Sequence, residues 1–457
     1  MQKIIVPAIL IFVCVIYAVY MNYDRILSKD LSQLSWMSSC DCENLNSNVT
    51  VTCNSKNETS LMISKIDENE SADILPNFTW YREQMKSNVS RKNFLTPNTA
   101  IFSAYEFPNQ IAVHILSLHM FGKTVYCHYF DSNRVSIGKP FEAFVFPESV
   151  IFCARRRKTV YVSITEKADE VPAFSIPLIQ RLSEPSHFFS VCIAPLYGTE
   201  PKFLQVAEFI EHHKLQGATY FYVYITNELS NYDRRILDYY VMIGEAEVIM
   251  MADQWGRPGE HWHTIQIHDC LHRSRSHANW TAFIDLDERL FANETTGSVV
   301  NYLRTITDPK VGSVTYRQRW VIKDEQMPEK YANLTETEKW LPTMRFHNTS
   351  KVTPPGWVVK TIIQSHKIFI MWIHYPSRYF PGFKGHDVDP KYGLSRHYRN
   401  KNDWVMKQFS EPNFGPLTPT NYPDKLAKPL IDGVLARIKY VYGGNYSLES
   451  KAWRYHK

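Results

Sequence analysis

The sequence is poor in glycine and has no long run of charges of one sign. Only 17 of its 457 residues are glycine, too few for a collagen-like or glycine-rich array. Lys and Arg number 51 against 46 Asp and Glu, and without a basic block this mild excess gives little support for nucleic-acid binding. Since 44% of the residues are apolar and 14% aromatic, we expect at least one large packed core rather than a disordered chain.

The eight cysteines lack the C-x2-C spacing that is typical of a zinc site. Cys14 lies in an apolar segment, and seven others follow: Cys40, Cys42, Cys53, Cys127, Cys153, Cys192 and Cys270. We expect disulfides in an oxidising compartment, and the odd number predicts one free thiol. The spacing does not identify the pairs. His268 and His272 have an i, i+4 spacing that can bind zinc, but Asp269 replaces the usual catalytic glutamate, so we interpret both histidines as helix-surface residues.

Residues 4–21 form an apolar run of 18 residues without a charge. As a helix this run would span about 27 Å, enough to cross a thin bilayer of the early secretory pathway. It is longer than the apolar part of a typical signal peptide and no small-x-small cleavage site follows, so we predict a transmembrane signal anchor. Ten Asn-x-Ser/Thr sequons place the chain beyond residue 21 on the lumenal side: Asn48, Asn57, Asn69, Asn77, Asn88, Asn279, Asn293, Asn333, Asn348 and Asn445.

Composition divides the chain into further segments. Residues 1–3 would be a cytoplasmic tail, and residues 22–97, rich in Asn, Ser and charged residues, a lumenal stem without periodicity. In residues 98–186, short β-branched and aromatic runs alternate with turn residues, which predicts a small antiparallel β-rich domain. Residues 187–420 are expected to form the main domain, and residues 421–457 a C-terminal extension.

Strand-like and helix-like runs alternate in the main domain. Two of the amphipathic helical runs stop at glycines, Gly217 and Gly244. The expected strands are 189–194, 219–225, 247–251 and 280–284, and the expected helices are 202–216, 232–243 and 261–278. This order predicts an α/β fold, a doubly wound and mostly parallel sheet, with its ligand at the carboxyl ends of the strands.

The expected strand 280–284 runs directly into the acidic sequence Asp285-Leu286-Asp287-Glu288. In an extended chain Asp285 and Asp287 project to the same side, where they could hold a hard divalent cation together with phosphate oxygens. Taken alone, Asp-x-Asp is more often a solvated strand end or an acidic helix start. At the end of a buried strand in a lumenal α/β protein it favours a nucleotide-sugar diphosphate bound through a metal. A metal-dependent phosphoesterase is the second interpretation.

Four blocks of the main domain carry a resemblance to a known family. They are Ala194-Pro-Leu-Tyr197 with 208–213 and Gly217; Asp269-Cys270; 283–288; and, after Lys360 and 372–374, the block His397-Tyr-Arg-Asn400. From about Val191 to Asn400 the chain resembles glycosyltransferase family 92, which is widespread in nematodes. The resemblance implies a GT-A-like enzyme of the Golgi membrane, with type II topology, that uses a UDP-sugar, often UDP-galactose, with manganese, and inverts the anomeric centre.

The resemblance also assigns roles to single residues. It implies a late histidine as third metal ligand beside Asp285 and Asp287; His397 is the first choice and His374 the second. Tyr197 lies in the first block and is expected at the nucleotide-sugar, together with Asp285. Arg273 and Arg275, on the helix before the acidic strand end, could reach the diphosphate.

An inverting transfer needs a carboxylate that takes the proton from the acceptor hydroxyl. Asp387 and Asp389, in a loop-like stretch between the late histidines, are the candidates, and Glu325 is a comparable one. The resemblance implies transfer of a hexose, with β1,4-linked galactose favoured, to a glycan such as fucose on an N-glycan core. The alternative is a catalytically silent glycan-binding or adhesion protein of the same topology. The presence of Asp285, Asp287 and His397 together favours the enzyme.

Overall fold

The computed structural model describes residues 100–444, apart from 117–120, 148, 182, 253–261, 403–404, 406 and 408–414. The described residues all fall within one unit of the chain, residues 65–457. Three predicted N-terminal segments lie outside the described residues. They are the tail at residues 1–3, the anchor at 4–21 and the stem at 22–97. Within the described part, no helix has both the length and the apolar character needed to cross a membrane.

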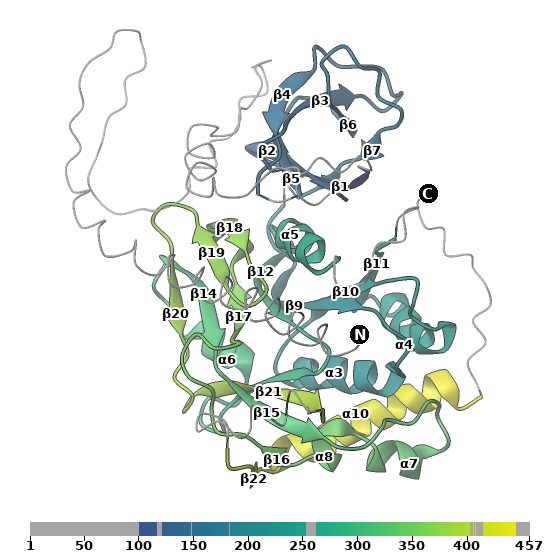
Figure 1. The fold of residues 1–457 in the computed structure, drawn as a ribbon, viewed down its shortest axis with the longest axis vertical. Coiled ribbons are helices and arrows are strands. Elements are labelled where there is room, and N and C mark those ends of the chain that lie inside the picture. The colour runs from purple at the N-terminus through teal and green to yellow at the C-terminus, as the bar shows by residue number, and fades with distance from the viewer. Residues whose placement is uncertain are drawn as a thin grey trace, which may run out of the picture. The chain divides into compact units, whose positions relative to one another are not determined.

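The N-terminal part of the described chain is β-rich, as the sequence predicts. It forms two four-stranded sheets, ordered β5-β2-β1-β8 and β4-β3-β6-β7. Their strands are β1 (Ile101–Phe107), β2 (Gln110–Ile115), β3 (Thr124–Phe130), β4 (Phe141–Phe144), β5 (Val150–Cys153), β6 (Tyr161–Thr165), β7 (Ile176–Pro177) and β8 (Ile179–Gln180). Figure 1 shows these strands curving around a shared interior, where buried Val113, Val125, Ile151 and Val162 pack together. A disulfide between Cys127 and Cys153 joins the two sheets.

A seven-stranded mixed sheet forms the centre of the following domain, in the order β11-β10-β9-β12-β17-β14-β20. The predicted strands correspond to β9 (His187–Leu196), β10 (Tyr220–Ile225), β11 (Ala246–Met250) and β12 (Ala278–Ile284), and the remaining strands are β14 (Val311–Tyr316), β17 (Lys360–Ile363) and β20 (Lys384–Asp387). The first four strands pair in parallel. β17 runs antiparallel to both β12 and β14. The predicted parallel half is therefore confirmed.

Helices cover both faces of this sheet because its buried strands are apolar on both sides. On β9, Val191 and Ile193 face the cluster that includes α3 (Phe203–Leu215), α4 (Asn231–Met242) and α10 (Asp424–Tyr442). Cys192 between them points to the opposite face, toward α5 (Trp262–Ser274). A Cys192–Cys270 disulfide links β9 to that helix. Cys40, Cys42 and Cys53 lie outside the described residues, so the predicted free thiol is not located.

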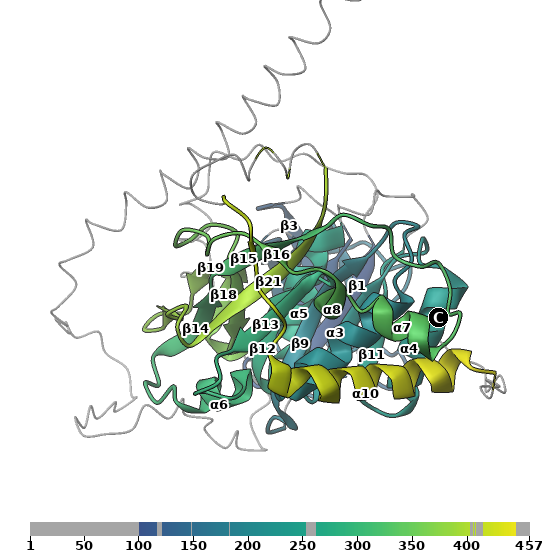
Figure 2. The ribbon, with the colours of Figure 1, turned by 90° about the horizontal axis from the view of Figure 1, so that it is seen from below.

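Helix α10 falls in the predicted C-terminal extension. Its buried Leu430, Val434, Ile438 and Val441 join the same apolar cluster as α3 and α4. Figure 2 shows α10, in yellow, running alongside α3. The segment up to residue 444 therefore packs as part of the α/β core.

Hydrogen bonds and positive-φ residues determine where the central helices begin and end. The Asp233 carboxylate accepts hydrogen bonds from the backbone amides of Lys202 and Phe203, each at 2.7 Å, which satisfies the free amides at the start of α3. After α3 the chain turns at Gly217, whose φ is +95° and whose position leaves no room for a Cβ beside Val300. Helix α5 ends earlier than predicted because Ser276 adopts a φ of 58° and closes a turn into β12.

The two histidines of α5 are not on a helix surface, contrary to the sequence-based interpretation. His268 and His272 are both buried, because α5 is covered by the central sheet on one side and by β1 and β2 on the other. The ring of His272 contacts those of His114 and Phe107. A helix that is enclosed on both sides does not show the amphipathic period from which surface positions are read.

A five-stranded sheet, ordered β13-β21-β15-β16-β22, adjoins the central sheet. Its strands are β13 (Glu288–Ala292), β15 (Gln318–Lys323), β16 (Asn348–Thr349), β21 (Gly393–Asn400) and β22 (Thr418–Pro419). The remaining described elements are α6 (Val299–Arg304), α7 (Leu334–Lys339), α8 (Pro342–Arg345), the 3-10 helix η3 (Ser365–Lys367) and the hairpin of β18 (Ile368–Met371) with β19 (Pro376–Tyr379). The chain enters the five-stranded sheet directly after β12, through the acidic segment.

Candidate functional site

Asp285 and Asp287 lie in the tight turn between β12 and β13, and residues 285–288 are called the acidic turn below. The Glu288 backbone N–H donates to the Asp285 carbonyl at 3.0 Å, and the Asp285 N–H donates to the Glu288 carboxylate at 2.9 Å. The expectation of an extended chain at this point is therefore wrong, since the chain turns here from one sheet into the other. Leu286 packs against the large apolar cluster, while the two aspartate side chains remain about 30% exposed, at 31% and 29%.

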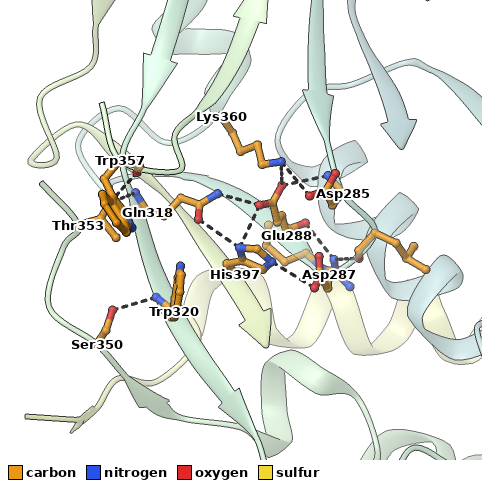
Figure 3. A network of polar contacts seen from close by, with 12 residues as sticks. Asp285, Asp287, Glu288, Gln318, Trp320, Ser350, Thr353, Trp357, Lys360 and His397 are labelled. Carbon is orange, nitrogen blue, oxygen red and sulfur yellow. Dashed lines mark hydrogen bonds and ion pairs between the residues drawn. The ribbon is translucent and has the colours of Figure 1, made fainter. Parts of the chain in front are cut away.

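Lys360, the first residue of β17, lies between two of the acidic groups. Its ammonium is 2.8 Å from Asp285 Oδ2 and 3.1 Å from Glu288 Oε2, with a side chain that is only 1% exposed (Figure 3). Burial would raise the pKa of Asp285, but Lys360 outweighs it and holds that pKa well below its ordinary value. Burial would likewise lower the pKa of Lys360, and the two carboxylates raise it instead. The lysine thus keeps Asp285 ionised and fixes its position.

His397 meets the other aspartate from β21. Because Glu288 and His397 are paired residues of β13 and β21, the imidazole lies over the acidic turn. Its Nε2 atom is 3.2 Å from Asp287 Oδ2, and its Nδ1 atom is 3.2 Å from both Glu288 Oε1 and Gln318 Oε1. Gln318 also donates from Nε2 to Glu288 Oε1 at 2.7 Å, as Figure 3 shows. Burial would raise the pKa of Asp287, but the charge and hydrogen bond of His397 lower it below its ordinary value.

The side chains around the acidic turn can be compared with the ligands that a metal ion requires. Among the described residues, no three His, Cys, Asp or Glu side chains are arranged as a ready metal site. Two donors do fit: ligand atoms that share an ion at about 2.1 Å and a right angle lie about 3 Å apart, and Asp287 Oδ2 and His397 Nε2 are 3.2 Å apart. Asp285 is held by Lys360. The residues therefore fit an ion held by one carboxylate and one imidazole, with the other positions left for a ligand and water.

A cavity of about 780 Å³ opens beside the acidic turn. It is lined by residues 194–197 at the end of β9, 200–202 and Gln205 at the start of α3, and 285–287. The rest of the lining consists of residues 323–327 with Glu329, and 399–401. His263 at the start of α5 also faces it, and burial lowers its pKa although Asp285 opposes this. The cavity thus lies at the carboxyl ends of the parallel strands, where an α/β fold binds its ligand.

Three residues predicted in this region do line the cavity or lie close to the acidic turn. Tyr197 lines the cavity and is 48% exposed. Glu325 also lines it and forms an ion pair with Arg345. His374, the second choice for a metal ligand, is half-buried, and burial together with Lys360 lowers its pKa to about 3. Of the two late histidines, only His397 has a ring nitrogen within hydrogen-bond distance of an acidic-turn carboxylate.

Arg273 and Arg275 do not line the cavity. The Arg273 guanidinium is 3.0 Å from the buried Asp269 carboxylate and 3.4 Å from Glu247. Arg275 lies over the Phe107 ring, 4.4 Å from its centroid. Both side chains thus point toward the β-rich domain, because a fully buried carboxylate such as Asp269 needs a cation beside it.

Asp387 and Asp389 also lie away from the cavity lining. Asp387 ends β20, the outermost strand of the central sheet, and is paired with Thr315. Asp389 is exposed and its carboxylate is 3.1 Å from the Lys391 ammonium. The structure therefore places Asp285, Asp287 and Tyr197 in the lining of one cavity, with His397 in contact with Asp287, but does not bring the two predicted bases to it.

Sequence reasoning did not assign roles to Lys360, Gln318, His263 or Lys323, although each lies in or beside the site. Glu288 could have been found, since it follows Asp287 directly in the acidic run. Lys323 and Gln318 stand on β15, far from the acidic turn in sequence, and only strand pairing brings them to it. No local pattern in the sequence shows that pairing.

Comparisons with known proteins identify the family of the main domain. The sequence model of glycosyltransferase family 92 matches residues 187–430, more than half of the chain. The β-1,4-galactosyltransferase galt-1 of Caenorhabditis elegans is 23% identical over 228 residues, which cover 45% of this chain and 53% of that protein. The chain thus aligns with about half the length of this curated relative.

Solved structures show weaker similarity. A mycobacterial protein is 11% identical and covers 56% of this chain and 75% of its own, with a TM-score of 0.23. HddC from Yersinia pseudotuberculosis is 10% identical and covers 54% of this chain and 99% of its own, with a TM-score of 0.23. Glucosyl-3-phosphoglycerate synthase from Mycobacterium tuberculosis is 13% identical and covers 55% of this chain and 80% of its own, with a TM-score of 0.22. Such TM-scores carry no argument about activity.

Proposed function

The chain belongs to glycosyltransferase family 92, and from this premise we propose that it is a metal-dependent, inverting hexosyltransferase with a UDP-sugar donor. The observation that carries the proposal is the contact of His397 with Asp287, a residue that lines the cavity. The relative named as a β-1,4-galactosyltransferase supports galactose as the hexose and a β1,4 linkage. The proposed acceptor is a glycan, such as fucose on an N-glycan core.

The residues in and around the acidic turn have different proposed roles. Asp287 and His397 would hold a manganese ion, whose positive charge would stabilise the diphosphate leaving group. Lys360 keeps Asp285 ionised and in place, so that its carboxylate faces the cavity beside Asp287. Gln318 and Glu288 fix the imidazole of His397 from its Nδ1 side, which leaves Nε2 directed at Asp287.

The proton of the acceptor hydroxyl needs a carboxylate that faces the cavity. Because Asp387 and Asp389 are not among the residues that line it, we place this role on two of the carboxylates that are, Asp324 and Glu325. Glu325 is paired with Arg345, which orients it but also competes for its oxygens. Asp324 lies next to Lys323 on the same wall.

Compartment and topology form part of the same proposal. The Cys127–Cys153 and Cys192–Cys270 disulfides and the ten sequons support a secretory-pathway protein. We propose a Golgi membrane protein with a lumenal catalytic domain, anchored through residues 4–21.

The test is a donor panel. The full chain, purified in detergent, is incubated with UDP-galactose, UDP-glucose and UDP-N-acetylglucosamine, with mixed glycan acceptors and either manganese or EDTA, and UDP release is followed. Manganese-dependent release with one donor supports the proposal and names the sugar. A folded chain that binds glycans but releases no UDP from any donor would favour the silent glycan-binding protein instead.

A further inference from the structure

Lys323 differs from the other buried lysines of the described chain. Four lysines are 7% exposed or less: Lys202, Lys323, Lys360 and Lys367. Three of them have partners: Lys360 pairs with Asp285 and Glu288, Lys367 donates to the carbonyls of Pro309 and Val311, and Lys202 donates to those of Gly198 and Glu200. The Lys323 ammonium has neither a hydrogen bond nor an ion pair with another described residue.

The Lys323 side chain is largely buried, and its ammonium, which is not fully shielded from solvent, has no partner among the described residues to replace the water that it has lost. Burial lowers the pKa of Lys323, and the carboxylate of Asp287 only partly offsets this. Asp287 forms no ion pair with Lys323, and its Oδ2 atom faces His397. The remaining direction open to the Lys323 ammonium is the cavity, which this residue lines.

The position of Lys323 follows from strand pairing. β15 and β21 run in parallel with Ile322 opposite Arg399 and Lys323 opposite Asn400, so both strands end at the same cavity wall. Arg399 brings a second cation to that wall, and its Nε atom is buried without a hydrogen-bond partner among the described residues. Lys323 and Arg399 thus bring two cations to the cavity, side by side on paired strands.

We propose that Lys323, supported by Arg399, binds the diphosphate of the nucleotide-sugar donor. This inference rests on the proposed transferase function, which supplies a diphosphate to the cavity. A diphosphate carries charge on two groups of oxygens, so one group can face the acidic turn through a cation while the other accepts a hydrogen bond from the Lys323 ammonium. Uridine has no such charge, and UMP has only one phosphate.

The experiment compares binding of UDP, UMP and uridine to the full chain by titration calorimetry with manganese present. In K323M we expect UDP affinity to fall about 10-fold to 100-fold, the range for losing a charge-assisted hydrogen bond, while uridine affinity is unchanged. K323R, which keeps the charge, should retain more UDP affinity than K323M. K384M removes a lysine that is 60% exposed on β20 and serves as the charge-matched control.

The outcomes separate the inference from the function on which it rests. A folded K323M that binds UDP as tightly as the wild-type chain, or that loses UDP and uridine affinity equally, would overturn the role of Lys323 alone. If K323M does not fold, K323Q and K323R replace it in the same comparison. A wild-type chain that binds none of the three ligands would overturn the proposed donor and this inference together.

Discussion

His397 and Asp287 face each other at 3.2 Å across the β13–β21 pair, although 110 residues separate them in sequence. The distance suits two ligands of one ion, and the histidine is fixed from behind by Gln318 and Glu288. The contact ties the acidic turn of the central sheet to the neighbouring sheet. It is the geometric basis for the metal-dependent transfer that we propose.

Replacing His397 should raise the requirement for metal. In H397Q we expect the manganese concentration for half-maximal UDP release to rise at least about 10-fold, because one of two protein ligands is lost. The measurement is a manganese titration of the release rate. H347Q, which changes a histidine outside the cavity lining, is the control. Identical titration curves for H397Q and the wild-type chain would exclude His397 as a ligand.

Removing Lys360 should destabilise the fold. K360M leaves Asp285 and Glu288 without their buried cation, which costs about 3 to 5 kcal/mol in the free energy of unfolding. Denaturant unfolding measures this loss. The double variant K360M/E288Q should recover part of it, since one of the two uncompensated carboxylates is then neutral. No difference between K360M and the wild-type chain would contradict the role given to the lysine.

Acid should weaken the contact between the β-rich domain and α5. Burial would raise the pKa of Asp269, but Arg273, His114 and hydroxyl donors including Ser103 and Tyr224 lower it to about 2. Since the folded pKa lies below the unfolded one of about 3.9, this carboxylate stabilises the protein above pH 4 and loses that contribution as the pH falls toward 2.

The expected contribution of Asp269 is about 2 kcal/mol at neutral pH. Unfolding measured from pH 5 to pH 2.5 checks it against D269N. The variant should be less stable at pH 7 and lose less stability on acidification than the wild-type chain. A D269N variant with the same pH dependence as the wild type would show that other groups control the acid response.

The base of the reaction should be found among the carboxylates that line the cavity. D324N or E325Q should lower kcat by about 10²-fold or more, the usual contribution of general base catalysis, while the affinity for UDP stays unchanged. D387N and D389N, in contrast, should leave kcat within about twofold, because neither side chain lines the cavity. A large loss in D387N or D389N with full activity in D324N and E325Q would restore the sequence-based assignment.

The sequence predicts the part of the fold whose signals are local. Apolar strands alternating with helices that stop at glycines gave β9 to β12 and α3 to α5 nearly at their observed positions, and the acidic end of β12 pointed to the site. His397 entered through the family resemblance, and its Nε2 atom lies 3.2 Å from Asp287 Oδ2.

The remaining site residues depend on pairings that are not local. Lys360, Gln318 and Lys323 come from strands whose partners are fixed by the whole domain. Arg273 was assigned to the diphosphate because its helix precedes the acidic strand, but the buried Asp269 one turn earlier binds it instead. The order of strands and helices along the chain predicts the edge of the sheet at which a residue lies. The direction of its side chain depends on packing between distant segments, which that order does not reveal.

The most direct test of the central claim is the rate of UDP release in wild type, D287N and D432N under saturating manganese. D432N is the matched control, since Asp432 is an exposed residue on α10 paired with Lys428. The account predicts that D287N folds normally but loses manganese-dependent release by at least about 10²-fold, while D432N equals the wild-type chain. A D287N variant with wild-type release, still abolished by EDTA, would contradict the assignment of the metal to the acidic turn.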